Sequence, residues 1–221
     1  MSNDLEPSGR ITFAVFAMLA GLLSVVLAFP AGLYSPRAPA ELLPYFNSHH
    51  SSYLFLAVTV LVWVVVAIPF VVGLGALLAS KSKTLSRAAT LLSAGGILLL
   101  GSAIFTFVGA FLAIVAASDV APSAAEATYQ AAIWGNLSFF LTAPGLMTLG
   151  AGQFLFAWLA WIGRVLPRSV SVVGFIGGLA GLLTLAVYQT SLLAQVQLGA
   201  FAIWGIAAGV VLLRHKPAPL I

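Results

Sequence analysis

A set of uncharged polar side chains lies in the otherwise apolar stretch of residues 124–161. Its members are Gln130, Asn136, Ser138, Thr142 and Gln153. Amide and hydroxyl groups donate and accept hydrogen bonds without carrying charge. Two uses fit this chemistry: contact with a small uncharged or lipidic ligand in a cavity, or hydrogen bonding to a neighbouring helix. The second use is the commoner one in membrane helices, but the residue pattern leaves both open.

The three histidines do not form a metal-binding pattern. His49 and His50 are adjacent, and adjacent side chains point about 100° apart on a helix and to opposite faces on a strand. Glu41 is the only further candidate ligand nearby in the sequence, and His215 belongs to a basic segment near the C-terminus. We therefore expect no bound metal and no other cofactor.

Ionisable side chains are missing from the centres of the apolar stretches, and the sequence contains no cysteine. Intramembrane acidic and basic residues are the usual marks of proton relays, voltage sensors and ion-coupled transporters. A hydrolase inside the membrane would need paired carboxylates or a histidine beside an acid. The sequence therefore predicts a protein that is not an enzyme.

The composition identifies the class of protein that must position these groups. Of the 221 residues, 62% are hydrophobic and 6% are charged, and the mean hydropathy is +1.12. Folding in water could not hide so much apolar surface, so we expect an all-α integral membrane protein. The formal net charge of +4 is then explained by basic residues that flank the spans, and no nucleic-acid partner is expected.

The apolar stretches predict one transmembrane helical domain that covers residues 1–221. The first stretch is too long, and its polar head too acidic, for a secretory signal peptide, so we expect it to be retained as a helix. The predicted spans are about 11–33, 53–79, 88–117, 124–161, 169–189 and 196–213.

The stretch 124–161 is too long for a simple span, because a continuous helix of this length would measure ~57 Å against a hydrocarbon core of ~30 Å. Either it is one overlong helix kinked at Pro144, or Thr142–Gly145 is a turn between two short spans. One helix places eight of the nine Lys and Arg residues on one side, with Arg37 alone on the other. The positive-inside rule therefore favours six spans with both termini in the cytoplasm.

Glycines recur four residues apart in the last two predicted spans. The pairs are Gly174 with Gly178, Gly177 with Gly181, and Gly205 with Gly209. This spacing is typical of membrane helices whose backbones approach closely.

Two segments carry a resemblance to a known family. They are Ala67-Ile-Pro-Phe-Val-Val-Gly-Leu-Gly-Ala-Leu-Leu78, before a basic turn, and Leu166-Pro-Arg-Ser-Val-Ser-Val-Val-Gly-Phe-Ile-Gly-Gly-Leu-Ala-Gly181. Together they resemble a bacterial six-helix membrane family known only as a domain of unknown function. The resemblance implies a helical membrane fold over most of the chain, and it implies no catalytic residues.

These observations favour a non-enzymatic, multi-pass protein of the cell membrane. The leading hypothesis is a structural or accessory subunit that packs through its glycine-rich helix faces. The alternative is a carrier or binder of a small uncharged or lipidic ligand in a cavity beside the helix over 124–161. The expected partners are the lipid bilayer and either other membrane subunits or further copies of the chain.

Overall fold

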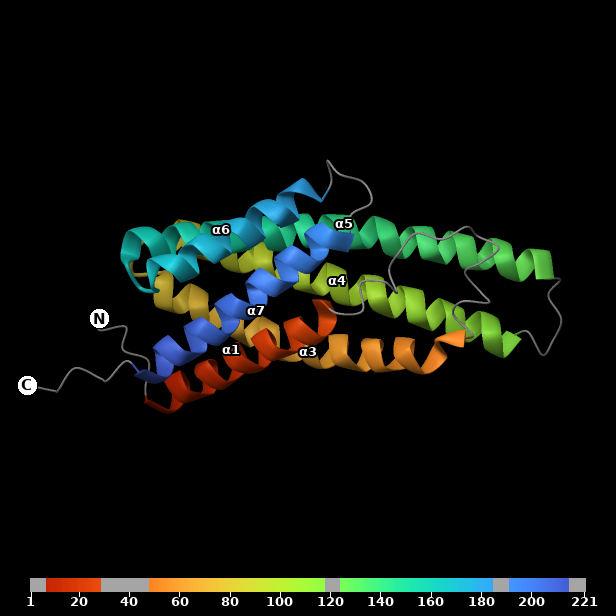
Figure 1. Cartoon of the computed structure of the whole chain (residues 1–221), viewed down its shortest axis with the longest axis horizontal. Coiled ribbons are helices and arrows are strands. Elements are labelled where there is room, and N and C mark those ends of the chain that lie inside the picture. Colours follow the sequence, from red (N-terminus) through yellow and green to blue (C-terminus); the bar gives the residue numbers. More distant parts are fainter. Residues whose placement is uncertain (1–6, 29–47, 118–123, 185–190, 215–221) are drawn as a thin grey trace, which may run out of the picture.

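The computed structural model describes residues 7–28, 48–117, 124–184 and 191–214, and every regular element in these ranges is a helix. Figure 1 shows their arrangement. The helices are α1 (Pro7–Ala28), α3 (His50–Leu78), α4 (Lys83–Ala117), α5 (Ala124–Gly163), α6 (Arg168–Leu183) and α7 (Ser191–Arg214).

Five of these helices, α1, α3, α4, α5 and α7, are long and apolar enough to cross a membrane, so the expectation of six transmembrane helices is confirmed for five. The remaining helix, α6, is also apolar but has only 16 residues. At ~1.5 Å per residue it measures about 24 Å, which is less than a hydrocarbon core of ~30 Å. Its predicted continuation over 185–189 lies outside the described residues.

The long segment of the sequence forms one helix. α5 continues through Pro144 for 40 residues, so the prediction of a single overlong helix is confirmed and the turn at Thr142–Gly145 is excluded. Thr148 Oγ1 donates a 2.6 Å hydrogen bond to the Pro144 carbonyl, one turn back along the helix. Arg37, Glu41 and His215 lie outside the described residues.

Several helix boundaries differ from the prediction. α4 begins at Lys83 rather than 88, because the Ser82 side chain caps it: Ser82 Oγ accepts a 3.3 Å hydrogen bond from the Leu85 backbone N–H. α7 begins at Ser191 rather than 196, so residues 191–195 are helical and Gln195 lies within the helix.

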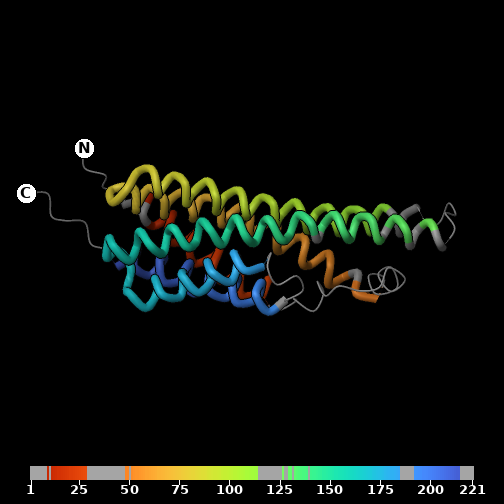
Figure 2. Tube along the Cα trace, turned by 90° about the horizontal axis from the view of Figure 1, so that it is seen from above, coloured from red at the N-terminus to blue at the C-terminus, as the bar shows by residue number. Residues whose placement is uncertain are grey.

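The helices have very unequal lengths, and this inequality shapes the molecule. α4 has 35 residues and α5 has 40, whereas α1 has 22 and α7 has 24. Figures 1 and 2 show α4 and α5 side by side along their whole length, and at the end away from both termini they extend beyond α1, α6 and α7. We call the place where α1 ends and α7 begins, beside these longer helices, the shoulder.

The turn from α3 to α4, the turn from α5 to α6 and the end of α7, which all carry basic residues, lie together at the opposite end, near the start of α1 (Figure 1). These basic residues are Lys81, Lys83, Arg87, Arg164, Arg168 and Arg214. The turn from α5 to α6 holds two of them in place. Arg164 has a positive φ of 50° and its N–H bonds the Trp161 carbonyl, while the Val165 N–H reaches the Ala160 carbonyl. This is the Schellman arrangement that ends a helix, and Arg168 then lies 5.5 Å from the centre of the Trp161 ring.

Glycines bring the helix backbones together, as their spacing predicts. A Cβ built on Gly21 of α1 would lie 2.7 Å from the Ala202 carbonyl oxygen of α7. A Cβ built on Gly150 of α5 would lie 2.8 Å from the Gly178 carbonyl oxygen of α6. These distances are too short for any side chain, so the glycine faces are used for packing within the chain.

Aromatic side chains fill the centre between α3, α5 and α7. Trp63 and Phe70 of α3 meet Phe201 of α7 edge to face, with ring centroids 6.0 and 5.7 Å apart. Phe156 of α5 lies 6.0 Å from Trp204 of α7. All five rings are almost completely buried, so they form a rigid core beneath the shoulder.

Candidate ligand-binding site

The five polar residues selected from the sequence do not form one group. Gln130 and Asn136 are exposed on the part of α5 that extends beyond the shorter helices. Ser138 is buried and Thr142 is half-buried near the shoulder, whereas Gln153 is buried deep among α5, α6 and α7. The 23 residues from Gln130 to Gln153 span about 35 Å along the helix axis, so one small ligand could not contact them all.

Two of these residues make hydrogen bonds that hold helices. Ser138 Oγ donates to the Ala103 carbonyl oxygen of α4 at 2.8 Å. Thr142 Oγ1 donates to the Ser138 carbonyl oxygen of its own helix at 2.9 Å. Ser138 therefore serves helix packing, while the oxygen of Thr142 keeps lone pairs that can accept a hydrogen bond.

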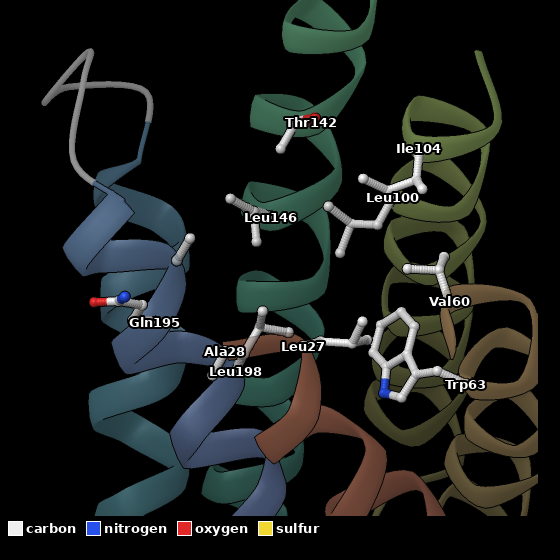
Figure 3. A pocket seen from close by; sticks show the side chains of 11 residues that line it. Leu27, Ala28, Val60, Trp63, Leu100, Ile104, Thr142, Leu146, Gln195 and Leu198 are labelled. Atoms are coloured by element: carbon white, nitrogen blue, oxygen red, sulfur yellow. The ribbon is translucent and has the colours of Figure 1, made fainter. Parts of the chain in front are cut away.

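A cavity of about 100 Å³ lies at the shoulder and has a nearly continuous apolar wall. Figure 3 shows its lining side chains, which come from α1, α3, α4, α5 and α7. They are Leu27, Ala28, Val60, Trp63, Leu100, Ile104, Thr142, Leu146, Ala194, Gln195 and Leu198. Of these described residues none carries a charge, and the amide of Gln195 points away from the other lining side chains in Figure 3. We call this space the shoulder cavity.

Trp63 is the largest side chain in this wall, and its position is fixed. Its Nε1–H donates a 2.8 Å hydrogen bond to Ser24 Oγ of α1, and Ser24 Oγ in turn donates to the Ala20 carbonyl at 2.7 Å. A buried indole whose N–H is satisfied does not need water or a ligand. The wall therefore exists before any ligand binds.

A group of buried polar side chains lies below the shoulder cavity, toward the basic end. Gln197 of α7 donates from Nε2 to the Leu146 carbonyl oxygen of α5 at 2.8 Å, and the Leu146 side chain forms part of the cavity wall. The amide of Gln153 faces α6: a Cβ built on Gly177 would lie 2.6 Å from Gln153 Nε2. The two glutamines are thus held against the glycine face of α6.

Most polar atoms of this group have no partner. Among the described residues no hydrogen bond reaches Gln153 Nε2 or Oε1, Gln197 Oε1, Ser171 Oγ or Trp204 Nε1. Gln153 is 1% exposed, so bulk water does not reach its amide. An unsatisfied buried polar group costs about 1–3 kcal/mol, so several of them in one place require an explanation.

Gln197 and Trp63 were not selected from the sequence. The signal for Gln197 was present, because it is an amide in an apolar helix, as Gln153 is. Trp63 carried no such signal, since one tryptophan in an apolar helix is unremarkable until its neighbours are known.

The histidine pair remains at the far end of the molecule. Ser48 Oγ and His49 Nδ1 lie 2.8 Å apart, within hydrogen-bond distance. In the ranges that the structure describes, no three His, Asp or Glu side chains lie close enough together to hold a metal ion.

Comparison with known proteins places this architecture in a family. A family model described as a domain of unknown function, DUF4386, matches residues 12–215. Nothing matched the chain among curated proteins or solved structures. The match extends from α1 to the end of α7 and so includes the shoulder cavity and the buried glutamines. The apolar helices of the chain are consistent with a membrane protein, and the chain belongs to the DUF4386 family.

Proposed function

We propose that the protein is a non-enzymatic, multi-pass protein of the cell membrane that binds a small uncharged or lipidic molecule in the shoulder cavity. The observation that carries this proposal is the cavity itself, with apolar walls from five helices and a tryptophan already fixed in place. Ligand sites in membrane and soluble bundles are commonly enclosed between helices in this way.

The volume and chemistry of the cavity define the ligand class. An engineered apolar cavity of about 150 Å³ binds benzene, so a space of about 100 Å³ holds a ring or the end of an acyl chain rather than a whole lipid. The apolar wall excludes a charged group, because desolvating the charge would not be repaid by any partner. Thr142 offers one acceptor, which suits a hydroxyl at the chain end.

A photoreactive fatty alcohol tests the proposal. We expect hexadecanol that carries a diazirine near its hydroxyl end to attach to Leu146, Leu198 or Trp63 in the purified protein. An excess of unlabelled hexadecanol should compete with this attachment. Ala194→Phe should lower this labelling about tenfold, because the ring would occupy the cavity. Peptide mass spectrometry of the adducts gives the measurement.

The matched control is Val196→Phe, which adds a similar ring to the exposed side of α7, outside the cavity wall. It should leave the labelling unchanged. Adducts spread over lipid-facing residues such as Val58 and Leu91, without competition by unlabelled alcohol, would show that the cavity is not a binding site.

The orientation of the protein is part of the same proposal: both termini, and the basic end, face the cytoplasm. The six basic side chains at that end support it through the positive-inside rule. Because the chain has no cysteine, Arg164→Cys gives a single label site. An impermeant maleimide should label it in inverted vesicles but not in intact cells, whereas Gln130→Cys at the other end of α5 should behave in the opposite way. Labelling of position 164 in intact cells would reverse the orientation.

The role of accessory subunit stays a prediction, but the surface that we expect a partner to contact is no longer the glycine-rich helix faces. The glycine faces of α5, α6 and α7 are occupied within the chain, so a partner would have to use other residues. The exposed aromatic residues Tyr129 and Phe140 on the extended part of α5 are the better candidates. Proteins that co-purify in mild detergent, and that are lost with Tyr129→Ser, would support this role.

A further inference from the structure

The buried face of α6 offers small residues to polar side chains from its neighbours. Ser171, Gly174, Gly177 and Gly181 recur every three or four residues on this face, and all are buried. Successive positions are therefore about 4.5–6 Å apart along the helix axis.

Each glycine on this face meets one polar side chain. A Cβ built on Gly174 would lie 3.0 Å from Trp204 Nε1, and one on Gly177 would lie 2.6 Å from Gln153 Nε2. A Cβ built on Gly181 would lie 2.5 Å from Gln197 Nε2 and 2.7 Å from its Oε1. The indole and the two amides thus form a row along α6, and the Ser171 hydroxyl lies on the same face one turn before Gly174.

The row contains both donors and acceptors, and they are unpaired. Trp204 Nε1 and Gln153 Nε2 are donors, Gln153 Oε1 and Gln197 Oε1 are acceptors, and the Ser171 hydroxyl can do either. Within the described part of the chain none of these atoms has a hydrogen-bond partner. The matching ligand is therefore neutral, small, and able to donate and accept at once.

We propose that the α6 face is a binding site for a file of water molecules that links Ser171, Trp204, Gln153 and Gln197. One water that makes two hydrogen bonds of about 2.8 Å at a near-tetrahedral angle joins atoms about 4.5 Å apart, which is comparable to the spacing of the row along the α6 axis. A single water between successive members of the row would thus satisfy an unpaired atom on each side. Buried waters of this kind normally make two to four such bonds.

Through this site, the buried face of the short helix α6 would carry a continuous file of water. The file runs from Ser171, one turn from the basic end, to Gln197, whose amide bonds the Leu146 carbonyl behind the shoulder cavity. Because no group in the row is ionisable, it would hold water or a neutral solute of similar hydrogen-bonding pattern rather than an ion. This inference does not depend on whether the shoulder cavity binds a ligand.

Pulsed X-ray radiolysis of the full-length protein in lipid nanodiscs tests the site. Radiolysis converts bound water into hydroxyl radicals in place, and these oxidise the side chains that the water touches. Trp204 and Trp63 are both 1% exposed, but the Trp63 N–H already bonds Ser24 while the Trp204 N–H has no partner. Trp204 should be oxidised about tenfold faster than Trp63, because a water lies against it. Equal, slow oxidation of the two tryptophans would show a dry interface and overturn the proposal.

The double variant Ser171→Ala, Gln153→Leu separates bound water from accidental opening of the helices. It removes the unpaired polar atoms on both sides of Trp204 in the row, so the oxidation rate of Trp204 should fall to that of Trp63. If the rate stays high, bulk water enters by another route and the file is not the cause. Should this variant fail to fold, Ser171→Ala removes one of the two neighbours of Trp204 in the row and should lower its oxidation rate about twofold, whereas an unchanged rate would count against the file.

Discussion

Gly96→Ala is expected to lower the free energy of unfolding by about 2–3 kcal/mol, because it overpacks a backbone-to-backbone contact between α4 and α5. A Cβ at this position would overlap the Leu149 backbone nitrogen and lie 2.7 Å from the Gly145 carbonyl oxygen. Both are backbone atoms, so no side-chain rotation can relieve the overlap. The two longest helices would have to separate along part of their shared length.

Gly109→Ala on the same helix is the matched control. No described atom outside the local helix backbone lies within 4 Å of a Cβ built there, so the methyl group meets open space. Alanine is favoured over glycine in a helix by about 1 kcal/mol, so this variant should be as stable as the parent or slightly more so. Unfolding in mixed detergent micelles, monitored by circular dichroism, gives the free energy of unfolding of both variants. Equal losses in the two variants would show that glycine flexibility, and not packing, matters on α4.

Trp63→Ala should cost about 3–5 kcal/mol, which is typical of removing a large buried aromatic side chain. The change leaves a void beside the shoulder cavity, removes the edge contact with Phe201 and takes the donor from Ser24 Oγ. Ser24 keeps its own bond to the Ala20 carbonyl, so the loss comes mainly from packing. The same unfolding assay applies.

Trp158→Ala provides the comparison for this result. Trp158 is 48% exposed on α5, so its removal should change the stability by less than about 0.5 kcal/mol. If Trp63→Ala were as mild as Trp158→Ala, the wall of the shoulder cavity would not be the rigid surface that ligand binding requires.

Much of the fold follows from hydropathy and charge. The apolar runs locate the helices because a backbone in lipid must satisfy its hydrogen bonds internally, and the distribution of Lys and Arg selects one long α5 over two short helices. Hydropathy places the start of α4 five residues too late, because a capping serine and the polar first turn after it add nothing to an apolar run.

The site is much harder to derive from sequence. Gln130 and Gln153 are the same residue type on the same apolar helix, yet one is exposed and the other is buried. The difference arises because α6 and α7 cover only part of α5, which depends on where distant helices end. The shoulder cavity has the same origin: it exists because α1 stops at Ala28 while α4 and α5 continue.

The continuity of α5 also fixes the distance between two partly exposed tryptophans. Trp161 and Trp134 are both 37% exposed, and the 27 residues between them correspond to about 40 Å along the helix. A bilayer with its headgroup layers is about 40–45 Å thick, and tryptophan prefers these layers. The spacing of the two rings on one continuous helix thus fits one ring in each headgroup layer of such a bilayer.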